Sequence, residues 1–136
     1  MTDARAAAAR WAHAWKHAWE ALDAEPIVAL YAPEAVFSSE PFREVYRGPR
    51  GVRSYVERVF GEEEDVRVRV STPIVDGDRA SISWWASLRE DGEDVTLAGT
   101  SVLRFDVDGL VMEQWDAWNA LAERREPPAT GTPFTE

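Results

Sequence analysis

The chain has 136 residues, of which 45% are hydrophobic and 29% are charged, which fits one globular domain with its own core. Its formal net charge of -10 disfavours nucleic acid and anionic membranes as partners, because the overall field repels phosphate. Cysteine is absent, which excludes disulfides and thiolate sites. Charged residues interrupt the alanine-rich start, so we expect no signal peptide, no membrane span and a cytoplasmic protein.

In the first third of the chain, apolar residues recur at the three- and four-residue steps that are typical of helices. His13 and His17 lie on the polar side of a first amphipathic helix, opposite an apolar stripe made of Trp11, Trp15, Ala18, Trp19 and Leu22. Asp23 and Pro26 predict that this helix stops and that a short second helix follows. The second helix is expected to carry Ile27, Leu30 and Tyr31 and to end near Pro33.

The next segment predicts a short strand, a loop and a third helix. Residues 35–39 are expected to form the strand, and residues 40–47 the loop, with Phe42 and Tyr46 in it. Gly48 and Pro49 are a typical helix start. The third helix presents a second apolar stripe of Val52, Tyr55, Val56, Val59 and Phe60 and ends at Gly61. The acidic run at 62–65 lacks the pattern of a calcium loop and is expected to be a solvated turn.

From Val66 onward the apolar period changes to two, which is typical of a sheet with one buried face. Asp-Gly turns separate β-rich runs and predict an antiparallel meander with strands near 66–75, 79–89, 95–105 and 110–118. Beyond Ala122 the chain is charged and then rich in Pro, Thr and Gly. We therefore expect a single domain at 1–122 and a C-terminal tail at 123–136.

Helices first and a curved sheet afterwards predict an α+β domain with its helices on one face of the sheet. Three segments carry a family resemblance: LYAPEAVF at 30–37, RGPRGVRSYVERVF at 47–60 and DGLVMEQWDAW at 108–118. With the element order, they resemble the NTF2-like superfamily and within it the SnoaL-like proteins. The resemblance implies a cone of three N-terminal helices on a strongly curved, mostly antiparallel sheet around a pocket. The superfamily includes cyclases, isomerases and epoxide hydrolases but also non-catalytic modules, so the fold alone leaves the activity open.

A carboxylate in such a pocket is the candidate general base, since poor solvation raises its pKa towards neutrality. Asp116 resembles the acid that SnoaL-like cyclases carry on their last strands, and alternation places it on one face with Met112, Gln114 and Trp118. The alternative is an ion pair between Asp116 and a surface arginine. Many relatives carry a second acid where this chain has Asn119.

Glu40, followed by Pro41, is the second candidate base, because ketosteroid isomerases resemble this chain in having an acid and a proline after the same short strand. Counted back from Gly48, the isomerase base falls on Ser39, and a shift of one residue turns a side chain to the other face. Arg43 is a candidate for holding a ligand anion, with a surface ion pair as the alternative.

The seven tryptophans of the chain predict an aromatic-lined cavity, although some of them are expected to be core. The residues expected to contact a ligand are Trp15, Trp19, Tyr31, Phe37, Phe42, Arg43, Tyr55, Trp84, Met112, Gln114 and Trp118. Trp84 and Trp85 point to opposite faces of their strand, so an inward Trp84 leaves Trp85 outside. An outer tryptophan is typical of a partner surface, and the resemblance implies a homodimer through that sheet face.

Two functions from different classes remain open. The first is a cyclase or isomerase that abstracts a proton from a hydrophobic carbonyl compound, with Asp116 as base, Gln114 or Tyr31 at the oxyanion and no cofactor. The second is a binding or association module that uses the same cavity without chemistry. His13 and His17 have the spacing of two metal ligands on one helical turn but lie on the polar side, so we expect no metal.

Overall fold

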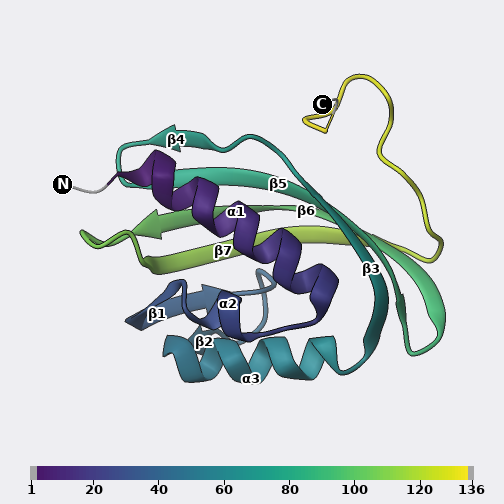
Figure 1. The fold of residues 1–136 in the computed structure, drawn as a ribbon, viewed down its shortest axis with the longest axis horizontal. Helices are drawn as coiled ribbons and strands as arrows, with labels where there is room; N and C mark the ends of the chain where they lie inside the picture. Colours follow the sequence, from purple (N-terminus) through teal and green to yellow (C-terminus); the bar gives the residue numbers. More distant parts are fainter. Residues whose placement is uncertain (1–2, 135–136) are drawn as a thin grey trace.

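The computed structural model of the protein describes residues 3–134 and has helices and strands on one curved sheet (Figure 1). The elements in chain order are α1 (Ala4–Ala21), α2 (Glu25–Val28), β1 (Tyr31–Ser38), β2 (Tyr46–Arg47), α3 (Gly48–Phe60), β3 (Glu63–Val70), β4 (Ile74–Asp76), β5 (Arg79–Glu90), β6 (Glu93–Phe105) and β7 (Val111–Leu121). None of the helices within these residues is long and apolar enough to cross a membrane. The predicted α+β class with three helices is confirmed.

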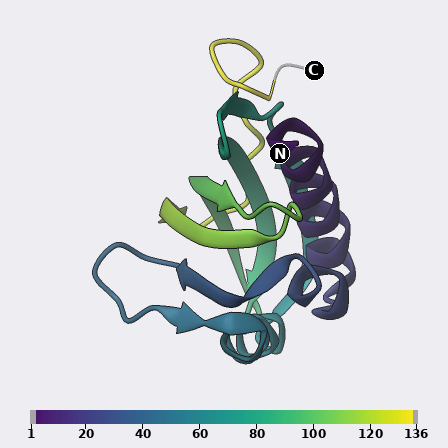
Figure 2. The same ribbon diagram turned by 90° about the vertical axis from the view of Figure 1, so that its left-hand side faces the viewer.

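The sheet has seven strands in the order β2-β1-β7-β6-β5-β3, with β4 added beside β5. Every pairing is antiparallel except that of β1 with β7. The sheet curls without closing, and α1 lies across one of its faces while α3 runs beside β1 and β2 (Figures 1 and 2). The concave side of the sheet therefore faces the helices.

Helix α1 forms as its apolar stripe predicts. The Asp3 side chain accepts a hydrogen bond from the backbone N–H of Ala6 and so caps the first turn. Trp11 and Trp19 are buried, whereas His13 and His17 are exposed. The helix ends at Leu22, which takes a left-handed conformation with φ 54°. This helix carries three tryptophans towards the sheet.

The segment after α1 differs from the prediction. Helix α2 ends at Val28 instead of near Pro33, and Tyr31 is the first residue of β1 instead of part of that helix. The backbone N–H of Val111 donates to the Leu30 carbonyl, and Tyr31 pairs with Val111. Pairing with β7 therefore extends this segment where its local sequence predicts a helix. The predicted strand at 35–39 is the second half of β1.

Helix α3 begins at Gly48, as predicted, and buries Val52, Val56 and Phe60. Gly48 has φ 64°, and a Cβ there would lie 2.8 Å from the Pro33 carbonyl oxygen, so both the conformation and the space favour glycine.

The meander of β5, β6 and β7 agrees closely with the predicted runs. In its centre Gly99 pairs with Trp84 on one side and with Trp118 on the other. The predicted strand at 66–75 is different, because it is divided into β3 and β4 and β3 begins earlier, at Glu63.

The tail beyond Ala122 has no helix or strand within its described residues, 123–134, and it packs on the outer face of the sheet. Trp85 donates its indole N–H to the Arg125 carbonyl oxygen at 2.7 Å, and its ring centroid lies 6.2 Å from that of Phe134. Phe134 is buried. Trp85 is on the outer face as predicted, but the chain's own tail covers part of it.

Candidate functional site

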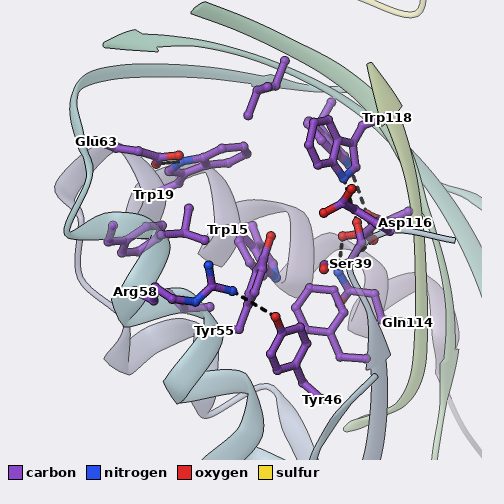
Figure 3. Close-up of a pocket in the computed structure, with 18 of the residues that line it drawn as sticks. Trp15, Trp19, Ser39, Tyr46, Tyr55, Arg58, Glu63, Gln114, Asp116 and Trp118 are labelled. Atoms are coloured by element: carbon purple, nitrogen blue, oxygen red, sulfur yellow. Dashed lines mark hydrogen bonds between the residues drawn. The ribbon is translucent and has the colours of Figure 1, made fainter. Parts of the chain in front are cut away.

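A cavity of about 650 Å³ lies between the concave face of the sheet and the helices (Figure 3). Aromatic, aliphatic and polar side chains from α1, α3 and the sheet line it. Ten of the residues predicted for the site line it: Trp15, Trp19, Phe37, Glu40, Arg43, Tyr55, Trp84, Gln114, Asp116 and Trp118. The cavity therefore combines apolar walls with polar groups that can orient a ligand, as small-molecule sites do.

Asp116 lies on the cavity wall in β7, and alternation along the strand buries it together with Gln114. Only 8% of the residue is exposed. Burial raises the pKa of its carboxyl from 3.8 to about 7, although hydrogen bonds from Ser101 and Gln114 oppose the rise. The predicted alternative, an ion pair with a surface arginine, does not form among the described residues.

A hydrogen-bond network fixes the direction of the groups around Asp116. The indole N–H of Trp11 donates to Gln114 Oε1 at 3.2 Å, and the Tyr31 hydroxyl, which accepts from Trp15, donates to the same oxygen. Because an indole N–H can only donate, the oxygen of the Gln114 amide faces α1 and its NH₂ faces Asp116. Gln114 Nε2 donates to Asp116 Oδ1 at 3.0 Å and to Oδ2 at 3.3 Å.

A second chain of donors reaches the same carboxyl from the neighbouring strand. Trp84 donates its indole N–H to Ser101 Oγ at 3.1 Å, and Ser101 Oγ donates to Asp116 Oδ1 at 2.6 Å. Oδ1 thus accepts two good hydrogen bonds, whereas Oδ2 accepts a single longer one. Oδ2 is therefore the oxygen that is more available to a proton or a ligand.

Tyr55 of α3 and Trp118 of β7 also face the cavity (Figure 3). Burial raises the pKa of the Tyr55 hydroxyl, with a smaller contribution from the Asp116 charge, while a hydrogen bond from Ser39 opposes the rise. This hydroxyl therefore stays protonated at neutral pH and can donate. The Trp118 indole N–H is occupied, since it donates to the Ser39 carbonyl oxygen at 2.7 Å.

Glu63 is a second buried acid in the cavity wall, and the sequence did not single it out. The residue is 6% exposed, and burial raises the pKa of its carboxyl from 4.5 to about 7, while a hydrogen bond from Trp19 opposes the rise. In a regular strand side chains point to the two faces in turn, so burial of Val66 would predict that Glu64, two residues earlier, is buried instead of Glu63. A β-bulge around Asp65, which has φ 53°, shifts the register and turns Glu63 inwards. The predicted solvated turn is therefore wrong for Glu63.

Three predicted ligand residues do not line the cavity. Phe42 is 101% exposed in the loop between β1 and β2, which projects from the body of the domain (Figure 2). Met112 lies at a register shift between β6 and β7, where an extra residue disturbs the alternation. Tyr31 is buried behind the wall and acts through Gln114. Phe42 and Met112 are thus corrections to the predicted site.

Glu40 and Arg43 lie at the edge of the cavity and close to solvent. The Glu40 carboxyl is 40% exposed and 4.0 Å from Arg43 Nε, and the Arg43 side chain is 74% exposed. Glu40 thus lacks the burial that Asp116 has, and Arg43 forms the surface ion pair that the sequence offered as its alternative role.

Sequence reasoning also missed Ser101, Tyr46 and Arg58, which line the cavity. Ser101, Leu103 and Phe105 are alternate residues of β6 and are all buried, so the period-two pattern of the sequence could have predicted an inward Ser101. Arg58 donates to the Tyr46 hydroxyl oxygen at 2.9 Å, and this contact depends on the loop geometry. Within residues 3–134 no group of three or more His, Cys, Asp or Glu side chains is arranged to hold a metal ion.

Comparisons with known proteins agree with this geometry. A search of curated proteins gives no match. Among solved structures, a hypothetical protein with a ketosteroid isomerase-like fold from Catenulispora acidiphila, in complex with trimethylamine, is 17% identical, with a TM-score of 0.67 over 76% of this chain and 81% of that one. The epoxide hydrolase/cyclase-like enzyme SalBIII, described for pyran ring formation in the polyether salinomycin, is 15% identical, with a TM-score of 0.74 over 88% and 95%.

An LEH-like epoxide hydrolase from M. tuberculosis is 19% identical, with a TM-score of 0.68 over 85% of this chain and 82% of that one. At these identities the structural likeness shows the NTF2-like fold alone. The profile of the SnoaL-like domain matches residues 9–114, which is more than half of the chain and ends two residues before Asp116. The chain therefore belongs to the SnoaL-like domain family.

Proposed function

We propose that the protein binds a small, mostly apolar carbonyl compound in the cavity and abstracts a proton from it, as a cyclase or isomerase does. The observation that carries the proposal is Asp116, a carboxyl buried in the wall of an aromatic cavity with its pKa raised to about 7. Such a carboxyl is partly ionised at neutral pH and is a stronger base than an exposed aspartate. The trimethylamine complex of one structural neighbour supports the view that this fold admits small molecules.

In the proposed step, Asp116 Oδ2 takes the proton from the carbon next to the ligand carbonyl. The C–H bond breaks, an O–H bond forms at Oδ2, and the electron pair moves to the carbonyl oxygen to give an enolate. In a ring closure the enolate carbon attacks a second carbonyl of the same molecule, and the alkoxide that forms takes the proton back from Asp116. In an isomerisation the substrate is a β,γ-unsaturated carbonyl compound, and Asp116 returns the proton to the γ carbon of the dienolate, which moves the double bond. Ser101 and Gln114 position the base through their hydrogen bonds to the carboxyl.

The enolate oxygen needs a donor, and we assign this role to Tyr55. The sequence suggested Gln114 or Tyr31, but Gln114 Nε2 donates to Asp116 and the Tyr31 hydroxyl donates to Gln114. The Tyr55 hydroxyl lines the cavity, and its raised pKa keeps it protonated. A preorganised donor in a site of low polarity stabilises developing negative charge more than water does.

The test is proton exchange with solvent. A panel of cyclic and aromatic ketones is incubated with the protein in D₂O, and loss of the α-proton signal is followed by NMR. We expect exchange that is accelerated by the wild-type protein, abolished by Asp116→Asn and reduced about 100-fold by Tyr55→Phe, the range for removal of one oxyanion donor. Ligand binding without exchange would contradict the enzyme proposal and leave the non-catalytic binding module.

We further propose that the protein forms a homodimer through the outer face of β6 and β7. Val102 and Trp115 pair there, and they are 40% and 50% exposed. An exposed apolar pair of this kind on an open sheet is typical of an interface. Light scattering is expected to give twice the monomer mass for the wild type and a monomer for Trp115→Glu. A monomeric wild type at about 100 µM would contradict the dimer, because stable interfaces hold together at such concentrations.

Residues 1–122 are proposed to be the folding domain and residues 123–136 a tail, of which residues 123–134 are described and cover part of Trp85. Thr96 and Trp85 bind the backbone of this tail, and Phe134 is buried. A chain truncated after Ala122 is expected to unfold cooperatively, with tryptophan emission shifted to longer wavelength. Loss of cooperative unfolding would place the tail within the domain.

A further inference from the structure

The carboxyl of Glu63 is held by one oxygen only. Trp19 donates its indole N–H to Glu63 Oε1 at 2.7 Å. Glu63 Oε2 is buried and has no hydrogen-bond partner within residues 3–134, and Glu63 forms no ion pair with any residue in that range. An unpaired buried carboxyl oxygen is costly, so it calls for a partner such as a water molecule, an ion or a ligand group.

Trp19, which binds this carboxyl, is part of a cluster of aromatic rings. The Trp19 ring lies 6.1 Å from that of Trp15 and 5.7 Å from that of Trp84, and both contacts are edge-to-face. All three tryptophans line the cavity together with Glu63. Tryptophan faces attract cations more strongly than other aromatic side chains do, especially where water is excluded.

The charge of the cavity has the same sign as Glu63. Among the described residues that line it, six carry a carboxyl group and two are arginines. Glu62 and Glu90 are near enough to Glu63 to raise its pKa further. The field in this part of the cavity therefore favours a positive ligand group.

Neither arginine of the cavity pairs with Glu63. Arg58 donates to the Tyr46 hydroxyl and lies 5.6 Å from the centre of the Tyr55 ring. Arg43 is mostly exposed and lies 4.0 Å from Glu40. A positive ligand group at Glu63 therefore meets no competing arginine among these residues.

We propose that Glu63 and Trp19 form a subsite for a protonated amine, so that the ligand is an amino ketone with its ammonium group at Glu63 and its carbonyl near Asp116. Figure 3 shows the two acids on opposite sides of the cavity with aromatic rings between them. The ammonium pairs with the Glu63 carboxyl and contacts the tryptophan faces. The inference rests on the proposed function for the carbonyl end of the ligand, but the amine subsite is testable without catalysis.

The experiment is calorimetric binding at pH 7 of phenethylamine and of its neutral analogue phenethyl alcohol. We expect the wild-type protein to bind the amine at least tenfold more tightly, since a charge-assisted hydrogen bond and a cation–π contact both favour the ammonium over the neutral hydroxyl. Glu63→Gln, which keeps an oxygen for Trp19, is expected to remove this preference. The matched control is Glu64→Gln, which removes one negative charge from the exposed neighbour of Glu63. This variant is expected to keep the preference for the amine over the alcohol.

The outcomes separate the two proposals. Equal binding of amine and alcohol by the wild type would overturn the amine subsite and leave the carbonyl proposal standing. If Glu63→Gln and Glu64→Gln lose the preference for the amine equally, the amine subsite is overturned too, because the preference would then come from the overall charge of the protein. Binding of neither compound would overturn the subsite, whereas the ketone exchange assay would still decide the role of Asp116. The wild-type comparison needs no variant, so a failure of Glu63→Gln to fold leaves the proposal testable.

Discussion

Asp116→Asn is expected to stabilise the protein, and increasingly so as the pH rises. A raised carboxyl pKa means that the folded state keeps a proton that the unfolded state has already lost. Between about pH 4 and about pH 7 the wild-type protein therefore loses stability as the pH rises, and above that window the loss is complete. An asparagine cannot ionise, so the variant escapes this loss, while its side-chain oxygen still accepts from Ser101 and Gln114.

The size of the effect follows from the pKa of Asp116 in the folded protein. A rise from 3.8 to about 7 corresponds to a free energy of about 4 kcal/mol, at about 1.4 kcal/mol per pKa unit. By linkage, about 2.5 kcal/mol of this accumulates between about pH 5 and about pH 8. Whole-domain stabilities are about 5–15 kcal/mol, so the change is large enough to measure.

Urea unfolding followed by tryptophan fluorescence provides the assay, since the chain has seven tryptophans. The free energy of unfolding is measured from about pH 5 to about pH 8 for the wild type, for Asp116→Asn and for Asp94→Asn, an exposed acid that serves as the control. The difference between Asp116→Asn and the wild type is expected to widen with pH, and that of the control to stay nearly constant. Parallel curves for Asp116→Asn and the wild type would refute the reasoning, because Asp116 would then titrate alike in both states.

Ser101→Ala removes the donor of the shortest hydrogen bond to the Asp116 carboxylate. The pKa of Asp116 is therefore expected to rise further, by about one unit, in an NMR titration. An unchanged pKa would show that the Ser101 hydroxyl does not favour the ionised form of Asp116. Gly99→Ala places a Cβ 2.5 Å from Trp118 Cβ, and urea unfolding is expected to show a loss of about 1–3 kcal/mol, whereas wild-type stability would mean that the strands relax freely. Phe42→Ala is expected to leave ligand affinity within about twofold, since the side chain is fully exposed; a tenfold loss would indicate that its loop closes over the ligand.

The parts of the fold with a regular period could be predicted from the sequence. The tryptophan stripe of α1, the Gly-Pro start of α3 and the alternation in β5, β6 and β7 each follow from local physical preferences. Alternation also placed Asp116 and Gln114 on the inner face, because β7 is regular from Glu113 onward. Apolar spacing and helix start and stop signals supplied the count of three helices, which is confirmed. The family resemblance supplied the pocket, and the structure has a cavity of about 650 Å³ there.

Two errors in the candidate site have a common physical cause. Glu63 and Met112 both lie next to register shifts, where one extra residue reverses the alternation of faces. A bulge depends on the pairing of two strands, so neither strand's own sequence reveals it. Tyr31 was similarly assigned to a helix because its partner, Val111, is 80 residues away in the chain. The contact between Trp85 and the tail is also non-local, and composition alone does not predict it.

A ¹³C NMR titration of the Asp116 carboxyl tests the central claim most directly, because it needs no knowledge of the substrate. The spectrum of Asp116→Asn assigns the signal, and the titration is repeated with a saturating ketone from the exchange assay. We predict a pKa of about 7 in the free protein and a change when the ketone binds. A pKa near the ordinary value of about 3.9, unmoved by any ligand, would contradict the account and remove Asp116 as the base.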